Sequence, residues 1–362
     1  MPLPSHELLT SLLRDVSRSF YLTLRVLPKP VRSQIGLAYL LARTTDTIAD
    51  TEIVPVETRL EALQNLANRI QGSRQEPLDF SRFIQAESPA SERRESGAER
   101  VLLTRVEEAI LLLKSFSPED QELIRKVLIT ITSGQELDLR RFEDGKRGLR
   151  ALANAAELDD YTYRVAGCVG EFWTRICYSH LAVGADRAGG MNLERMIADG
   201  IRFGKGLQLV NILRDVPADL KNGRCYIPED SLRALGLQPR DLLSPKNETA
   251  LRPAYHKLLD DAHEHLSAGW NYTTSLPRNW VRVRLACAWP ILIGERTIAL
   301  LRTQNVLDPA HRVKISRGQI KRILARSILL YPFRKTWAGL FLPGNPQVGA
   351  GNATSSTGNV ST

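Results

Sequence analysis

Two aspartate pairs with the same spacing are the residues of this chain best suited to chemistry. The first is Asp46-Thr-Ile-Ala-Asp50 and the second is Asp215-Val-Pro-Ala-Asp219. Arg43 lies just before the first pair and Arg214 just before the second. Positions i and i+4 share one face of a helix, so each pair would direct two carboxylates the same way. Mg²⁺ usually binds one or two carboxylates together with phosphate oxygens. The spacing therefore predicts a site where Mg²⁺ and arginines hold a diphosphate.

The alternative is that each pair lies on an ordinary solvated helix face, which is the commoner origin of a single Asp-x-x-x-Asp spacing. Like charges at i and i+4 destabilise a helix slightly. Here that repulsion occurs twice, each time beside an arginine and within an otherwise apolar segment. This repetition suggests that a cation offsets the repulsion.

Composition limits the classes of partner. The 362 residues are 43% hydrophobic, which is enough for a sizeable core, and the net charge of +9 indicates anionic partners. Diphosphates and anionic lipid surfaces both fit this charge. Nucleic acid is not expected, because no basic tract has the interleaved aromatic residues that stack on bases.

The cysteines and the apolar runs predict a cytoplasmic protein without a transmembrane helix. We also expect a monomer, with peripheral contact to a membrane as an option. Four cysteines without paired spacing indicate reduced, buried thiols: Cys168, Cys177, Cys225 and Cys287. The N-terminus lacks the pattern of a signal peptide, and no apolar run reaches the roughly 18 residues of a transmembrane helix.

Helical periodicity dominates the chain, and no alternating run is typical of a central strand. We therefore expect an all-α protein with one compact domain over residues 1–342, within which the polar segment 71–99 forms a loop or insertion. Ser117 and Pro118 are typical of the first residues of a helix. The expected helical segments are 6–24, 29–49, 57–70, 101–113, 117–138, 161–183, 193–215, 230 onward, 251–269 and 283–302.

The C-terminal part of the chain is different. Segment 321–342 is basic and amphipathic and contains aromatic residues, and Pro332 interrupts it. It is interpreted either as a membrane-interface segment or as a last helix packed on the core with a basic outer face. Residues 343–362 are rich in Gly, Asn, Ser and Thr and are expected to be a disordered tail.

Several segments around the aspartate pairs together resemble the squalene and phytoene synthases. The matching segments, in the order of that family, are Ser17–Phe20, Tyr39–Asp50, Tyr161–Gly167, Gln208–Asp219 and Gly223–Pro228. The resemblance implies a helical bundle of the isoprenoid synthase type around a central apolar cavity. It also implies Mg²⁺-dependent prenyl transfer in the synthesis of isoprenoids such as sterols or hopanoids.

Two later segments favour the squalene branch of the family. Cys287–Thr297 resembles its Cys-Ala-x-Pro helix, and Val313–Gln319 resembles a basic segment associated there with NADPH. Three positions depart from the family pattern: Ala49 and Ala218 replace residues that are acidic in eukaryotic squalene synthases, and Ser316 replaces an expected arginine. These departures remove potential metal ligands and one potential NADPH contact.

The resemblance also assigns roles to residues. Two molecules of farnesyl diphosphate would be joined head to head into presqualene diphosphate, which NADPH would reduce to squalene. The cavity must exclude water, which would quench each carbocation. Tyr161 is the candidate acid or base, although the pKa of an unperturbed phenol is near 10. The metal ligands would be Asp46, Asp50, Asp215 and Asp219; the phosphate contacts Arg18, Arg43 and Arg214; the pocket residues Tyr39, Gln208 and Asn211; and the NADPH contacts Lys314 and Arg317.

Other functions remain open alongside this one. A phytoene or dehydrosqualene synthase, or a presqualene diphosphate synthase, would omit the reduction. Retention of all four aspartates argues against a non-catalytic membrane adaptor. A basic RNA-binding helical protein is a further alternative, but the sequence contains no motif for RNA binding. The acidic and histidine-rich segment 260–265 and the pairs Glu107–Glu108 and Asp159–Asp160 are interpreted as solvated helix faces.

Overall fold

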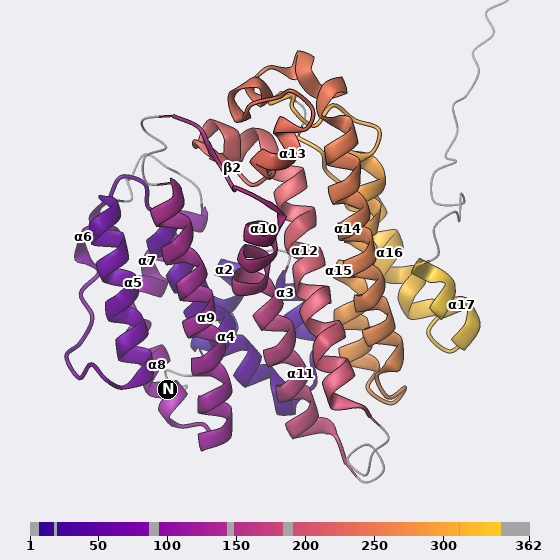
Figure 1. Ribbon diagram of the computed structural model, residues 1–362. Helices are drawn as coiled ribbons and strands as arrows, with labels where there is room; N and C mark the ends of the chain where they lie inside the picture. The colour runs from indigo at the N-terminus through magenta and orange to yellow at the C-terminus, as the bar shows by residue number, and fades with distance from the viewer. Residues whose placement is uncertain are drawn as a thin grey trace, which may run out of the picture.

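The computed structural model describes residues 7–17, 20–86, 94–142, 148–183, 191–310 and 312–341, and these residues form a helical bundle (Figure 1). The all-α class expected from the sequence is confirmed. The strands of the described residues are two dipeptides, β1 (Arg150–Ala151) and β2 (Arg224–Cys225), which pair in parallel. No helix in the described ranges is long and apolar enough to span a bilayer.

The first half of the chain builds one side of the bundle. Its helices are η1 (Leu8–Leu12), α2 (Leu13–Ser17), α3 (Phe20–Val26), α4 (Lys29–Asp50), α5 (Val56–Gln71), α6 (Ser81–Ala86), α7 (Arg94–Thr104), α8 (Val106–Lys114) and α9 (Pro118–Phe142). The Ser117 hydroxyl accepts a hydrogen bond from the backbone N–H of Asp120, as expected for a helix that begins at Pro118. Buried side chains of α4, α5, α8 and α9 form the core of this side.

The second half contains the longest helices. They are α10 (Ala155–Thr162), η3 (Tyr163–Gly167), α11 (Cys168–Leu181), α12 (Leu193–Lys221), α13 (Glu229–Arg233), η5 (Pro239–Leu243), η6 (Pro245–Asn247), α14 (Glu248–Ser275), α15 (Val281–Leu301), α16 (Arg317–Leu329), α17 (Arg334–Ala338) and η7 (Gly339–Phe341). Helix α12 lies between α11 and α14, as Figure 1 shows, and it also contacts α15 and β2. It thereby connects the two sides of the bundle.

Glycine allows a close helix contact between α11 and α12. A Cβ atom on Gly170 of α11 would lie 1.8 Å from the carbonyl oxygen of Gly200 of α12, and a Cβ on Gly200 would lie 2.9 Å from the carbonyl oxygen of Gly170. Only residues without a side chain permit the two backbones to approach this closely. The contact fixes α11 against α12, and α12 carries the second aspartate pair.

Helices α10 and α11 form one continuous rod because η3 between them is a π-helical turn. Tyr163 and Cys168, at the two ends of this turn, keep right-handed helical backbone angles. A π turn closes its hydrogen bonds over five residues instead of four and is often found at functional sites. Tyr161 lies in the last turn of α10, directly before it.

Some segments differ from the sequence expectations. Segment 71–99 contains α6 and the first residues of α7, and Arg105, which does not continue the helix, divides the helix expected over 101–113 into α7 and α8. Helix α12 extends to Lys221 although Pro217 lies inside it. In the C-terminal part, α16 begins at Arg317 and α17 begins after Pro332, and the tail 343–362 lies outside the described residues.

Candidate active site

A cavity of about 500 Å³ opens between the two sides of the bundle. Its walls come from α4, α9, the α10–η3 rod, α12 and β2. Ten of its fifteen lining residues are charged or carry a side-chain amide, so this cavity suits a charged ligand group. The lining residues are Arg43, Asp46, Ala49, Asp50, Ile131, Gln135, Asp138, Leu139, Tyr161, Val165, Gln208, Asn211, Arg214, Asp215 and Arg224.

The first aspartate pair lies on α4 and faces this cavity. Burial and the neighbouring charge of Asp50 raise the pKa of Asp46 to about 6, although Arg43 and a hydrogen bond from Gln135 oppose the shift. Arg43 lies 3.7 Å from Asp46 and forms a closer ion pair with Glu99 of α7. Burial also raises the pKa of Asp50. The negative charge of this pair is therefore only partly compensated by the protein.

The second aspartate pair lies on α12, and its two members have opposite environments. Both oxygens of Asp215 are bound by arginine: Arg214 Nη2 lies 2.6 Å from Oδ2, and Arg312 Nη2 lies 2.7 Å from Oδ1. Burial acts against these contacts, but together they lower the pKa of Asp215. Burial and the charge of Asp215 raise the pKa of Asp219 to about 7. Asp219 lines a smaller hollow beside the cavity, together with Arg224.

The donor set of the site fits a cation that shares its coordination with a phosphate. No three acidic, histidine or cysteine side chains within the described part of the chain converge on one point, as a metal site made of protein ligands alone would require. Asp46, Asp50 and Asp215 nevertheless line one cavity, and neighbouring carboxylates contribute to the raised pKa values of Asp46 and Asp219. Mg²⁺ commonly takes one or two carboxylates and completes its shell with phosphate oxygens and water.

A chain of hydroxyl and carboxylate groups lies at the wall of the cavity, where Tyr161 and Asp138 line it. The Tyr161 hydroxyl donates to the Tyr226 hydroxyl at 3.3 Å, and Tyr226 donates to the Asp138 carboxylate at 2.9 Å. The two tyrosine rings are stacked with centroids 4.8 Å apart. Arg224 Nη1 lies 3.5 Å from the same carboxylate, held by the pairing of β2 with β1.

These contacts determine which groups hold protons. Burial and the charge of Asp138 raise the pKa of Tyr161 well above its ordinary value, so the phenol stays protonated. Burial raises the pKa of Asp138 to about 6 despite Arg224 and the hydrogen bond from Tyr226. Asp138 is therefore a stronger proton acceptor than an ordinary aspartate.

Comparisons with known proteins identify the family of the chain. Residues 13–319 match the family model described as "Squalene/phytoene synthase". This chain belongs to the squalene/phytoene synthase family. The resemblance inferred from the sequence motifs is thereby confirmed.

Individual relatives within the squalene/phytoene synthase family differ in what their names say they make. The squalene synthase of Saccharomyces cerevisiae is 25% identical over 317 residues, which are 87% of this chain but 66% of the yeast protein. The presqualene diphosphate synthase of Sinorhizobium fredii is 29% identical over 315 residues, 86% of this chain and 93% of that protein. A solved complex of TcSQS with the ligand E5700 has the same fold, with a TM-score of 0.70, 20% identity and coverage of 94% of this chain and 93% of that one.

Most site residues suggested by the family motifs line the cavity. These are Arg43, Asp46, Asp50, Tyr161, Gln208, Asn211, Arg214 and Asp215, and Asp219 lies beside them. Tyr39 does not line the cavity; its hydroxyl donates to the backbone carbonyl of Val16 at 3.4 Å. Lys314 and Arg317 are exposed outside the cavity and form no ion pair with a described residue. Arg18 lies outside the described residues.

Several site residues had no assigned role in the sequence analysis. Gln135 and Asp138 share a face of α9 at i and i+3, but nothing local separates them from other polar helix positions. Arg224 and Tyr226 lie in the matched segment 223–228, where the motif alone did not show what they contact. Arg312 reaches Asp215 across 97 residues of sequence, so only the tertiary structure shows this pair.

Most members of the acidic clusters set aside in the sequence analysis are bound to neighbouring side chains. Arg302 binds Asp260, and His263 Nδ1 lies 2.9 Å from Glu295. The remaining pairs are Arg69 with Glu107, Arg105 with Glu108, Lys205 with Asp159 and Arg164 with Asp160. These contacts agree with the interpretation as ordinary helix surfaces.

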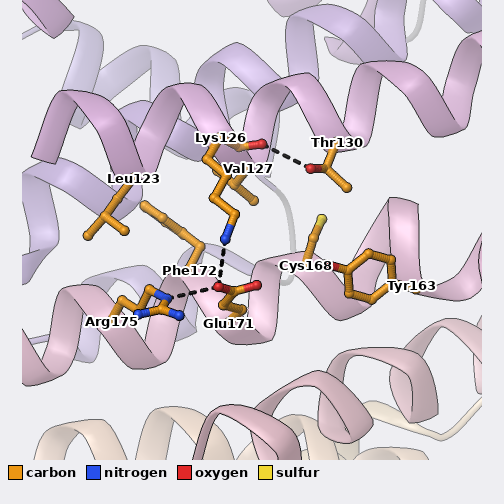
Figure 2. A pocket seen from close by; sticks show the side chains of 9 residues that line it. All are labelled: Leu123, Lys126, Val127, Thr130, Tyr163, Cys168, Glu171, Phe172 and Arg175. Atoms are coloured by element: carbon orange, nitrogen blue, oxygen red, sulfur yellow. Dashed lines mark hydrogen bonds and ion pairs between the residues drawn. The ribbon is translucent and has the colours of Figure 1, made fainter. Parts of the chain in front are cut away.

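A second hollow, between α9 and α11, is too small for a ligand. Its volume is about 10 Å³, which is close to the minimum for one water molecule. Figure 2 shows Glu171 at its edge, bound by both Lys126 and Arg175. Burial raises the pKa of Cys168 beside it to about 12, so this thiol stays protonated.

Proposed function

We propose that the protein joins two molecules of farnesyl diphosphate head to head into presqualene diphosphate and then reduces this product to squalene with NADPH. The observation that carries the first reaction is the cavity lined by Asp46, Asp50, Asp215 and Tyr161 together with five arginine or amide-bearing residues of the matched segments, with Asp219 in the hollow beside it. The names of the yeast and Sinorhizobium relatives support the same pair of products.

The charged walls would bind and activate the diphosphate of the donor. Arg43, Arg214 and Arg224 lie around the cavity and would neutralise phosphate oxygens. Asp46 and Asp50 on one wall and Asp215 and Asp219 at the other would hold Mg²⁺ together with that diphosphate. Mg²⁺, when bound, would act as a Lewis acid that stabilises the negative charge of the departing diphosphate.

The chain of hydroxyl groups would remove the proton that is lost when the cyclopropane ring closes. Tyr161 Oη would accept this proton from the carbocation while it passes its own proton to Tyr226 Oη. Tyr226 would in turn pass its proton to Asp138, so the phenol never becomes a free phenolate. The raised pKa of Tyr161 opposes simple deprotonation, whereas Asp138, with a pKa of about 6, can accept a proton near neutral pH.

Two surface cations are candidates for the reduction step. Lys314 and Arg317 precede or begin α16 and are free of ion pairs with described residues, so their charges suit the phosphates of NADPH. NADPH would supply the hydride. Because both residues lie outside the cavity lining, they support this step less directly than the cavity supports the condensation.

The second candidate function is presqualene diphosphate synthesis without reduction. The position of Lys314 and Arg317 outside the cavity lining favours it, as does the relative of that name, 93% of whose length this chain spans. A phytoene or dehydrosqualene synthase would also lack the reduction.

Product analysis tests these functions. Purified protein would be incubated with farnesyl diphosphate and Mg²⁺, with and without NADPH, and with a chelator as a further control. We expect presqualene diphosphate without NADPH and squalene with it; presqualene diphosphate or dehydrosqualene in both samples would establish the non-reducing function. Asp46→Asn should abolish turnover, whereas Asp260→Asn, in an ion pair outside the cavity, should not. Turnover of geranylgeranyl diphosphate alone, or none at all, would refute the proposal.

A further inference from the structure

The basic charge of the protein is concentrated near its C-terminal end. Residues 312–341 contain eight basic residues and no acidic one, although the whole chain has 49 basic and 40 acidic residues. The remainder of the chain is therefore almost neutral. The eight are Arg312, Lys314, Arg317, Lys321, Arg322, Arg326, Arg334 and Lys335. Such a segregated charge favours an anionic partner of large area.

Exposed apolar side chains cluster inside this basic segment. Ile328 is 50% exposed, Leu329 is 72% exposed and Phe333 is 62% exposed. They lie at the end of α16 and just before α17, and exposed Pro332 lies between them. We call these four residues, with Arg334 and Lys335, the C-terminal patch. Single exposed apolar residues are common on proteins, but a clustered group indicates an interaction site.

The aromatic residues around the C-terminal patch show that the exposure of Phe333 is imposed by the fold. Trp337 is buried, stacks on Trp270 with centroids 5.0 Å apart, and donates to the Ser327 carbonyl at 3.0 Å. Tyr331 packs edge-on against Trp337 at 5.3 Å. The ring of Phe333 is left outside this cluster although it lies between two of its members in sequence.

Further contacts hold the turn that carries the patch. The Tyr331 hydroxyl donates to the carbonyl of Arg278 at 2.7 Å, and Arg278 Nη2 donates to the carbonyl of Pro332 at 3.2 Å. Arg278 is itself exposed, so it adds a further cation beside the apolar residues. The patch is a fixed apolar tip surrounded by positive charge.

The location of the patch separates it from the candidate active site. Figure 1 shows α16 and α17 at the edge of the bundle, next to α15 and on the side opposite to α5 and α6. No residue of α16 or α17 lines the 500 Å³ cavity. Binding at the patch would therefore leave the cavity free.

We propose that the C-terminal patch docks the protein on an anionic lipid surface. Leu329 and Phe333 enter the interface between headgroups and acyl chains, and the surrounding cations contact the headgroups. Apolar insertion and a polybasic surface together make two signals, which stable but reversible membrane binding requires. RNA would match the charge alone and would leave Ile328, Leu329 and Phe333 without a role.

Vesicle co-sedimentation of the full chain tests the proposal. The protein would be mixed with vesicles of phosphatidylcholine alone or with one third phosphatidylglycerol, in the absence of substrate. We expect sedimentation with the anionic vesicles, weakened but not abolished by salt. Leu329→Asp combined with Phe333→Asp should reduce binding roughly tenfold or more, because both anchors become anionic. A helical circular dichroism spectrum and a cooperative thermal unfolding transition like those of the unchanged protein would show that this variant is folded.

A matched variant controls for the added charge. Leu111 and Val183 are 60% and 69% exposed on other parts of the surface, so Leu111→Asp with Val183→Asp changes charge and exposed apolar area similarly. This control should sediment like the unchanged protein. The proposal is refuted if the unchanged protein stays in solution or if both double variants bind the vesicles equally. Binding to RNA that only the patch variant loses, without binding to vesicles, would assign the patch to RNA instead. None of these results depends on the reaction proposed above.

Discussion

Replacing Asp138 by asparagine should stabilise the protein above pH 6. Burial is the main cause that raises the pKa of this carboxyl from 3.8 to about 6. Because the folded state binds the proton more tightly than the unfolded state, stability is intact below about pH 4 and falls as the pH rises to about 6. A difference of about two pKa units corresponds to about 3 kcal/mol. Only 10% of the side-chain surface is accessible, so solvent reduces this value little.

Asparagine at position 138 has similar shape but cannot ionise, so it avoids this cost. Its amide changes the contacts with Tyr226 and Arg224, which offsets about 1 kcal/mol of the gain. The Asp138→Asn variant should therefore exceed the unchanged protein by about 2 kcal/mol at pH 8. Near pH 4 the native carboxyl is protonated, so the gain is absent and the variant should be about 1 kcal/mol less stable because of its altered contacts.

Urea unfolding at several pH values between 4 and 8, in the presence of a chelator, measures this difference. Asp260→Asn is the control, because Asp260 lies outside the cavity and 61% of its side-chain surface is accessible. A gain that does not depend on pH, or a less stable variant at pH 8, would refute the reasoning. Asp138→Asn should also lower the condensation activity by about 100-fold, since Asp138 is the final acceptor of the proposed proton transfer.

Three further predictions use other contacts. Tyr161→Phe should lower kcat by about 100-fold in a steady-state assay, with a change of only about 1 kcal/mol in urea unfolding. Gly170→Ala should destabilise the protein by about 3 kcal/mol or more, since its Cβ would lie 1.8 Å from a carbonyl oxygen. Gly318→Ala is the control: its Cβ meets no close contact, so it should stabilise α16 by up to about 1 kcal/mol. Both changes would be measured by thermal or urea unfolding, and equal effects would contradict the helix contact. Arg312→Gln should raise the pKa of Asp215 and lower stability at pH 7 by about 1 kcal/mol, a modest effect because Arg312 is 56% exposed. That deficit should shrink as acid protonates Asp215, and a constant deficit would assign it to lost packing.

The parts of the site that could be predicted from the sequence are those with a local pattern. Asp46 with Asp50, and Asp215 with Asp219, each lie four residues apart, and this spacing alone places both carboxylates on one face of a helix. The all-α class also followed from local periodicity. Helix ends were predictable where a capping residue marks them, as Ser117 does before α9.

The parts that could not be predicted depend on contacts between distant segments. Asp138 is one acidic residue among several on α9, and its role comes from Tyr226, 88 residues away in sequence. The ion pair of Arg43 with Glu99 joins the site to a segment whose polar composition indicated a loop. Nothing local shows that Tyr39 packs toward Val16 instead of the cavity.

The π-helical turn η3 gives the helix of the active-site tyrosine room for one additional codon. This turn holds one residue more than an α-helical turn would, so the extra residue is absorbed within one turn. Losing one residue between Tyr163 and Gly167 would let α10 and α11 merge into an unbroken α-helix. Tyr161 and the contact of Gly170 with Gly200 would then keep nearly the same relative orientation. A relative without this residue would thus retain the geometry of Tyr161, whereas the loss of one residue from a regular α-helical part of the rod would rotate the flanking segments by about 100° relative to each other.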